Sequence, residues 1–165
     1  MEAPGTVHLR ESGGLAWQPV SPRLRTVRLT VLAVVLAPFL VAFAVLAVWV
    51  SPWLWTGAGA VAALLAWGAY VVVRQVPAIS WVELPDEIVI RRGRIFRRMV
   101  VVPYGRLQYV DLQSGPLMRH FGLATIEIHT ASPSSSGEVP GLPTDVAESL
   151  RERLSERGES LRAGL

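Results

Sequence analysis

The stretch that decides the fold is Leu29–Val50, which reads LTVLAVVLAPFLVAFAVLAVWV. It opens a longer segment, Leu29–Val73, that contains no Asp, Glu, Lys or Arg. One crossing of a hydrocarbon core of about 30 Å needs about 20 apolar residues, so this segment of about 45 residues has room for two spans but not for three. We therefore predict a two-helix transmembrane hairpin, with spans at about residues 29–50 and 53–73.

The turn between the spans, SPWLWTG at Ser51–Gly57, contains helix-breaking Pro52 and two tryptophans, which favour membrane interfaces. Arginines flank the hairpin on both outer sides, and the turn has none: Arg23, Arg25, Arg28, Arg74, Arg91 and Arg92. By the positive-inside rule, the sequence predicts a multi-pass protein of the plasma membrane with both termini cytoplasmic. A cleaved signal peptide is the alternative for the first span, but its apolar run is longer than a usual signal core and a second span follows directly.

Small residues recur at four-residue spacing in both predicted spans. They are Ala33 and Ala37 in the first span, and Ala58, Ala62 and Ala66 in the second. Small side chains let helix backbones approach closely. We interpret these residues as packing the two helices of one chain together, with a dimerisation face as the alternative.

The charge composition limits the classes of function. All sixteen basic residues are arginine, the net charge is +3, and there is no cysteine, which excludes disulfides and cysteine metal sites. Basic surfaces attract anionic lipid headgroups. The arginines lack an RNA-binding motif or a recognition-helix context, so no nucleic-acid partner is expected. Neither span contains an ionisable side chain of the kind used in proton relays or ion pathways.

After the hairpin, short runs of β-branched residues bounded by turn signals predict strands. We place them at residues 80–84, 87–91, 95–102, 106–112, 123–130 and, as a short last strand, 138–142. Gly93 supplies the positive φ for a tight hairpin turn. Alternation in the strand at 123–130 places Ile126 and Ile128 on one face, and Glu127 and His129 on the other.

The C-terminal part has the pattern of an amphipathic helix. Asp145 and Glu148 have the spacing of a capping box, and Gly158 is expected to end the helix. The apolar stripe consists of Val146, Leu150 and Leu154. Strands followed by one such helix indicate an α+β domain in which the helix covers an open end or face of the sheets.

An ordered set of motifs runs through this region: Arg92-Gly93, Val102-Pro103, Arg106-Leu107-Gln108 with Val110, Gly115-Pro116-Leu117 with Arg119, and Gly122-Leu123-Ala124. This set resembles the bacterial PH-like (pleckstrin-homology-like) domain of YdbS-like membrane proteins. The resemblance covers about Leu29–Leu154, including the two preceding helices. It implies two antiparallel sheets packed nearly orthogonally with a C-terminal helix over one end, and it implies no catalysis.

The expected organisation has four parts. They are a disordered cytoplasmic segment at residues 1–28, the transmembrane hairpin at 29–73, the PH-like domain at 76–157, and a tail at 158–165. We expect the serine-rich stretch SPSSSG, residues 132–137, to form a flexible loop.

Two groups of residues are candidate binding sites. The arginine hairpin comprises Arg91, Arg92, Arg94, Arg97 and Arg98. It is either a patch that faces anionic headgroups or a set of charged strand edges that discourage aggregation. The candidate interaction loop comprises Leu117, Met118, Arg119 and Phe121, within residues 113–121. It is either a partner surface or a plug for the domain core, and the direction of Met118 separates the two interpretations.

No pattern of catalytic or cofactor-binding residues is present in the sequence. His8, His120 and His129 lack metal-ligand spacing, and there is no nucleophile elbow, phosphate loop or carboxylate pair. We therefore expect no enzyme, cofactor or metal, and predict a membrane-anchored interaction module in an envelope-associated assembly. Its partner would be a longer membrane protein with several PH-like copies, or a second copy of this chain. The alternatives are a binder of anionic phospholipid headgroups, and an auxiliary subunit of a membrane enzyme or transporter.

Overall fold

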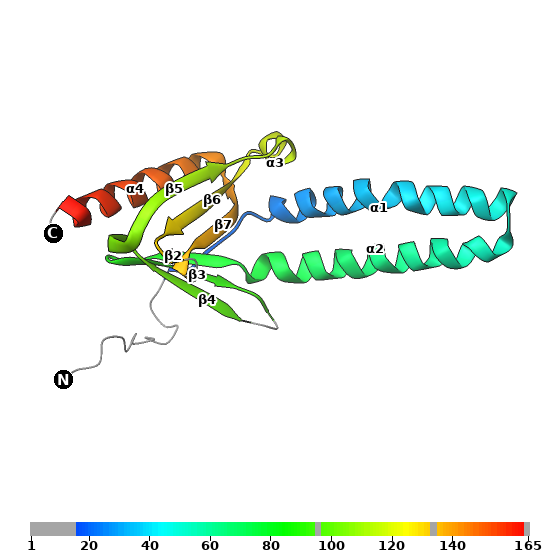
Figure 1. The fold of residues 1–165 in the computed structure, drawn as a ribbon, viewed down its shortest axis with the longest axis horizontal. Helices are drawn as coiled ribbons and strands as arrows, with labels where there is room; N and C mark the ends of the chain where they lie inside the picture. Colours follow the sequence, from blue (N-terminus) through cyan, green and yellow to red (C-terminus); the bar gives the residue numbers. More distant parts are fainter. Residues whose placement is uncertain (1–15, 95–96, 133–134, 164–165) are drawn as a thin grey trace.

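The computed structural model describes residues 16–94, 97–132 and 135–163. Two long helices, α1 (Arg23–Trp49) and α2 (Trp55–Gln75), run side by side and project from a β-rich domain (Figure 1). A short helical turn, η1 (Pro52–Leu54), joins them. Both helices are long and apolar enough to cross a membrane. Both predicted apolar segments form helices, although α1 begins at Arg23, before its apolar stretch.

The packing of this helix pair differs from our interpretation of the small residues. Four of the five alanines are exposed: Ala33, Ala37, Ala62 and Ala66. Instead, large side chains of α1 pack against glycines of α2. A Cβ added at Gly57 would lie 2.7 Å from Phe43 Cδ1, and one added at Gly68 would lie 2.9 Å from Leu32 Cδ2. Of the alanines, only Ala58 is buried as we expected.

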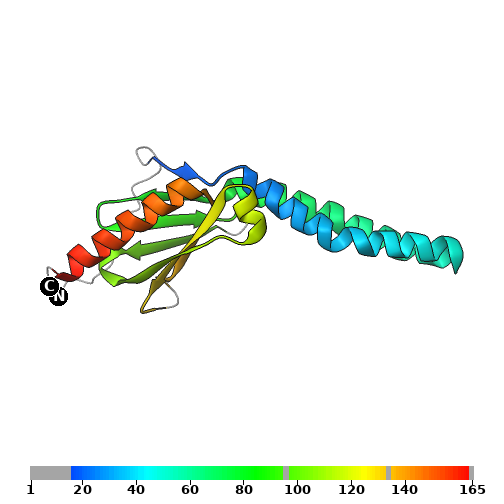
Figure 2. The same ribbon diagram turned by 90° about the horizontal axis from the view of Figure 1, so that it is seen from above.

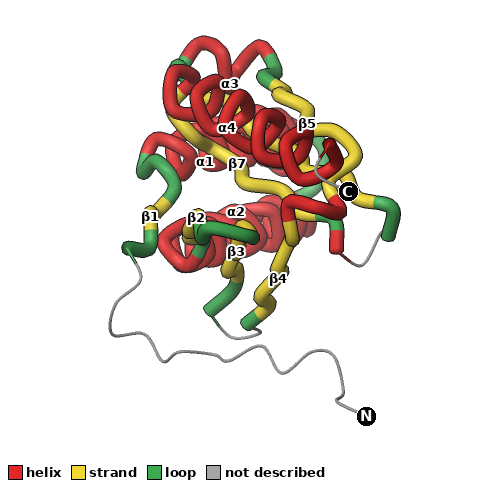
Figure 3. Tube along the Cα trace, turned by 90° about the vertical axis from the view of Figure 1, so that its left-hand side faces the viewer, coloured by secondary structure: helices red, strands yellow, loops and turns green. Residues whose placement is uncertain are grey.

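The soluble domain contains two antiparallel sheets. The first has the strand order β1 (Gln18–Pro19), β2 (Ser80–Glu83), β3 (Glu87–Arg92) and β4 (Arg98–Pro103). The second has the order β5 (Leu107–Gln113), β6 (Leu123–Thr130) and β7 (Gly137–Pro143). Figure 3 shows β1 to β4 in a row, with β7 and α4 on one side of them. Three short helices, η2 (Val76–Ala78), η3 (Tyr104–Arg106) and α3 (Pro116–His120), connect these elements.

The strand predictions agree closely with this architecture. Strand β6 has the predicted bounds, and Ile126 and Ile128 are at most 1% exposed. Gly93 has a φ of 87°, as the predicted hairpin turn requires. Two antiparallel sheets with a C-terminal helix confirm the PH-like fold. The predicted serine-rich loop, residues 132–137, lies partly outside the described residues.

The C-terminal helix, α4 (Thr144–Ala163), runs along the sheets and away from the helix pair (Figure 2). Leu150 and Leu154 are fully buried in the core. The helix continues through Gly158, which we expected to end it, and a Cβ at that glycine would lie 3.4 Å from Leu107 Cβ. That distance is an ordinary van der Waals contact, so α4 packs against β5 at this position. Asp145 occupies the first turn of the helix rather than the expected N-cap.

The segment before the first span is also different from the expected disordered one. Residues 1–15 lie outside the described part of the chain, but Gln18–Pro19 pair with β2. Val20, Leu24 and Val27 are buried in the core of the soluble domain. The Ser21 amide donates to the Gly141 carbonyl at 3.0 Å. Sequence on both sides of the transmembrane hairpin therefore builds one domain.

Candidate functional site

The arginine hairpin is formed by β3 and β4, which pair Arg91 with Met99 and Arg92 with Arg98. Side chains alternate between the two faces of a strand. Arg92 points toward β7, where its Nη2 lies 3.2 Å from Glu138 Oε2 and also donates to the Glu138 carbonyl. This residue thus joins the two sheets, and it does not line the hollow that Arg91, Arg94 and Arg97 border.

These three arginines line one hollow, which we call the arginine pocket. It has a volume of about 200 Å³ and is lined by Ala78, Arg91, Gly93, Arg94 and Arg97. Ala78 belongs to η2, which follows α2 directly. The end of β3 and the start of β4 lie on the side of the domain from which the helix pair projects (Figure 1). The arginine pocket is therefore close to the point where the chain leaves the second membrane helix.

The charges of the arginine pocket are not neutralised by the described part of the chain. No carboxylate there lies within 4.0 Å of the Arg91, Arg94 or Arg97 guanidinium groups, and Arg94 and Arg97 are exposed. The Arg91 guanidinium lies over the Trp17 ring, 4.8 Å from its centroid. Such a cation–π contact holds a charged side chain without neutralising it. Sequence reasoning missed Trp17, because it is 74 residues from Arg91 and no local pattern links them.

The candidate interaction loop turns toward the domain. Leu117, Met118 and Phe121 are half-buried and pack against the core. The Thr125 hydroxyl lies 3.6 Å from Met118 Sδ. Arg119 is exposed and donates to the Ser114 carbonyl at 3.2 Å. A partner surface would require Met118 to point outward, but its side chain packs against the core.

A polar cluster missed by sequence reasoning holds α4 against the first sheet. The Arg153 Nη2 lies 2.7 Å from Glu83 Oε1, and the Arg157 Nη1 lies 3.6 Å from Glu83 Oε2. Arg157 also donates to the Tyr104 hydroxyl at 3.0 Å, and that hydroxyl donates to the Leu84 carbonyl at 3.0 Å. Burial raises the pKa of Tyr104, while the hydrogen bond and charge of Arg157 oppose the shift. The hydrogen bond from Arg153 to Glu83 raises the pKa of Arg153.

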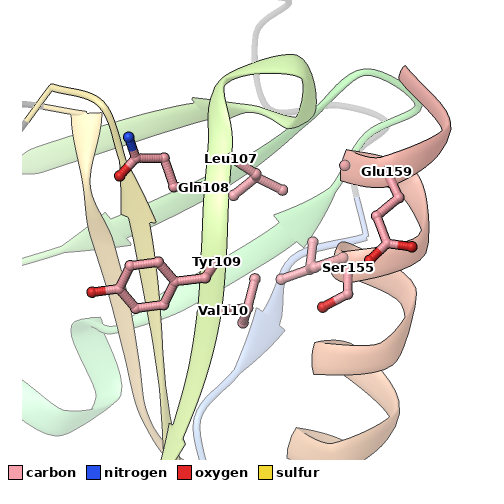
Figure 4. A pocket seen from close by; sticks show the side chains of 8 residues that line it. Leu107, Gln108, Tyr109, Val110, Ser155 and Glu159 are labelled. Carbon is pink, nitrogen blue, oxygen red and sulfur yellow. The ribbon is translucent and has the colours of Figure 1, made fainter. Parts of the chain in front are cut away.

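A second hollow, of about 170 Å³, lies between β5 and α4 (Figure 4). Its lining consists of Leu107, Gln108, Tyr109, Val110, Leu154, Ser155, Gly158 and Glu159. The Tyr109 ring points away from α4 and stacks on His129 at 4.3 Å between centroids. The residues that line this hollow include no histidine, lysine or cysteine that could act as a base or nucleophile beside Ser155 and Glu159. The described residues also contain no cluster of three or more candidate metal ligands.

Comparison with known proteins places this architecture in a family. Residues 26–158 match the sequence family described as Bacterial PH domain. Over 69 residues the chain is 39% identical to UPF0699 transmembrane protein YdbS of Bacillus subtilis (strain 168). That alignment covers 42% of this chain and 42% of the relative, so the chain matches less than half of that protein's length. No solved structure matches. Because the family match includes most of α1, all of α2, strands β2 to β7 and most of α4, this chain belongs to the Bacterial PH domain family and is a YdbS-like membrane protein.

Proposed function

We propose that this protein is a non-enzymatic, membrane-anchored module whose PH-like domain engages anionic phospholipid headgroups through the arginine hairpin. The single observation that supports it is the position of Arg91, Arg94 and Arg97 around a hollow that also includes Ala78, three residues beyond the end of α2. A basic residue near an anionic leaflet contributes about 1 kcal/mol. The attraction falls off over a Debye length of about 8 Å, so placement beside the membrane helix decides its strength.

The proposal includes an orientation. Arg23, Arg25 and Arg28 lie at the start of α1, and Arg74 lies in the last turn of α2. The turn between the helices has no charged residue. By the positive-inside rule, the soluble domain then lies in the cytoplasm, against the inner leaflet of the plasma membrane, where anionic lipids attract the arginines.

The test uses the full chain, because Val20, Leu24 and Val27 belong to the core and a fragment starting after the second span would lack them. The protein is reconstituted in nanodiscs of phosphatidylcholine alone or with phosphatidylglycerol. Hydrogen exchange of the β3–β4 amides is then measured by mass spectrometry. We expect slower exchange in the anionic discs, and we expect high salt to remove the difference because exposed charges are screened.

The triple variant Arg94→Gln, Arg97→Gln, Arg98→Gln should exchange equally fast in both kinds of disc. A matched control, Arg151→Gln with Arg119→Gln and Arg106→Gln, removes the same charge from exposed positions outside the arginine hairpin and should keep the lipid effect. Equal exchange of the unmodified protein in neutral and anionic discs would contradict the proposal.

A second candidate function, an interaction module in an envelope-associated assembly, is favoured by the position of β5 at the end of the second sheet. Strand β5 is at the edge of that sheet and borders the hollow beside α4. Edge strands recruit strands of other proteins. The partner would be a second copy of this chain or a longer PH-like membrane protein.

Ser155→Arg should fill the hollow and reduce co-purification of a differently tagged second copy in mild detergent. Glu152→Arg, on the exposed side of α4, should leave co-purification unchanged, and equal recovery with both variants would exclude self-association through β5.

A further inference from the structure

We infer that the arginine pocket is a site for the phosphate monoester of a lipid headgroup, of the kind that phosphatidic acid carries. This inference rests on the proposed headgroup contact and narrows it from surface charge to one chemical group. The arginines border a hollow and do not lie only on a flat basic surface. Ala78 and Gly93 have small or no side chains and leave space, while Arg91, Arg94 and Arg97 supply three guanidinium groups.

The donor set fits a phosphate monoester better than a diester. Each guanidinium presents five N–H donors in a planar fork that matches phosphate oxygens in pairs. A phosphate monoester carries a charge of about −1.5 to −2 at neutral pH and three terminal oxygens. A phosphodiester has one negative charge and two such oxygens. Three arginines around one hollow therefore favour the monoester over the diester, because the monoester has more negative charge and one more terminal oxygen.

The size of the hollow restricts the ligand further. At about 200 Å³ it is smaller than the range of about 300–1,000 Å³ that is typical of sites for drug-sized molecules. A single phosphate group fits this scale better than a phosphate with a bulky sugar. The rest of the lipid would remain in the leaflet beside α2, because Ala78 is only three residues beyond Gln75.

Two contacts fix the wall of the arginine pocket before a ligand binds. The Arg91 guanidinium rests on Trp17, and its backbone pairs with Ser80 of β2. The neighbouring Arg92 is bound to Glu138 of β7 and so fixes the end of β3. Side chains and strands that are already ordered lose less entropy on binding. The described residues place no carboxylate in the hollow that would compete with a phosphate.

Native mass spectrometry of the full chain in mild detergent tests the inference, with phosphatidic acid and phosphatidylglycerol titrated separately. One additional charge-assisted hydrogen bond contributes about 1.5–3 kcal/mol, so phosphatidic acid should bind at least about tenfold more tightly. In Arg94→Gln with Arg97→Gln this preference should disappear. In Arg98→Gln with Arg106→Gln, which removes the same charge from outside the hollow, it should persist. Arg94→Lys with Arg97→Lys keeps the charge but not the fork, and should retain phosphatidylglycerol binding while losing most of the preference.

Three other outcomes of this titration would contradict the phosphate site, the headgroup contact or the lipid assignment. If both Gln pairs weaken binding equally, the hairpin acts by net charge, so the phosphate site is wrong while headgroup engagement stands. If the unmodified protein binds neither anionic lipid better than phosphatidylcholine, both proposals fail. If inorganic phosphate displaces phosphatidic acid at equal concentration, the ligand is free phosphate and the lipid assignment is wrong. Thermal unfolding of the variants should match that of the unmodified protein, since Arg94 and Arg97 are exposed.

Discussion

Tyr104 is fully buried beneath α4, and its hydroxyl is the centre of the polar cluster there. Burial is the main reason that its pKa is raised, because desolvation disfavours the phenolate. The unfolded chain releases this proton near pH 10, before the folded protein does. The resulting stability is fully present below pH 10 and is lost as the pH rises through 10 toward the folded pKa.

Tyr104→Phe should therefore reduce the loss of stability at alkaline pH. At neutral pH it should cost about 1 kcal/mol, because the hydrogen bonds to Leu84 and from Arg157 are lost. Thermal unfolding in detergent between pH 8 and 11 measures both effects. Tyr109→Phe is the control, since Tyr109 is 58% exposed and should leave the alkaline slope unchanged. An unchanged slope in Tyr104→Phe would assign the alkaline transition to other groups.

Trp17 acts on the arginine pocket through a single contact. Its ring holds the Arg91 guanidinium, and a cation–π contact of a partly exposed pair contributes about 0.5–1 kcal/mol. Trp17→Leu should weaken the binding of phosphatidic acid about two- to fivefold, as measured by native mass spectrometry. Trp53→Leu, in the turn at the far end of the helix pair, should have no effect on this affinity. Equal weakening by both substitutions would mean that Trp17 does not act through Arg91.

At the scale of elements, the first turns of α1 belong to the soluble domain although they precede the first span. Leu24 is 1% exposed and contacts the chain at Gly141, where φ is +69° and a Cβ would lie 2.7 Å from Leu24 Cδ2. Leu24→Ala should destabilise the soluble domain by about 2–5 kcal/mol, because a buried leucine leaves a cavity. Thermal unfolding of the full chain in detergent measures this loss. Leu46→Ala is the control, since Leu46 is 46% exposed near the opposite end of α1 and should leave unfolding of the domain nearly unchanged.

Strong local patterns explain which elements could be predicted from the sequence. The uncharged segment fixed both spans, and the alternation in residues 123–130 fixed β6 because one face of that strand is buried. Strand β1 has only two residues, and the whole helix pair lies between β1 and β2 in the sequence. No local sequence signal therefore indicated that the two strands pair. Gly158 lies inside α4, next to Leu107, so the weak helix propensity of glycine does not end the helix there.

The candidate sites could also be predicted only as far as local sequence patterns allow. The run of arginines is visible in the sequence, but the tertiary structure gives its members different roles. Arg92 forms an ion pair between the sheets, whereas Arg91, Arg94 and Arg97 line one hollow. The composition of the loop at Leu117–Phe121 was compatible with either a surface or a core. Only the packing of Met118 against the domain distinguishes them.

At the scale of the whole molecule, the soluble domain packs against the start of α1 and the end of α2, which together form one end of the helix pair. Leu24 and Val27 of α1, and Val76 directly after α2, all lie in its core. The domain is thus connected to the spans through both α1 and α2. Two such connections restrict rotation of the domain relative to the spans more than one flexible linker would. The proposed headgroup contact requires that the side carrying Ala78 and the arginine hairpin stays next to the bilayer, and these connections would keep it there.

The orientation of this assembly is open to a direct test, because the chain contains no natural cysteine. Thr56 lies at the exposed start of α2, in the turn between the spans, and Ser149 lies on the exposed side of α4. With both termini cytoplasmic, Thr56→Cys should react with a membrane-impermeant maleimide in intact cells, whereas Ser149→Cys should react only after the membrane is permeabilised. Equal labelling of both sites after permeabilisation is the control for accessibility. Labelling of Ser149→Cys but not of Thr56→Cys in intact cells would invert the topology, and the arginine hairpin would then face the opposite leaflet from the one proposed.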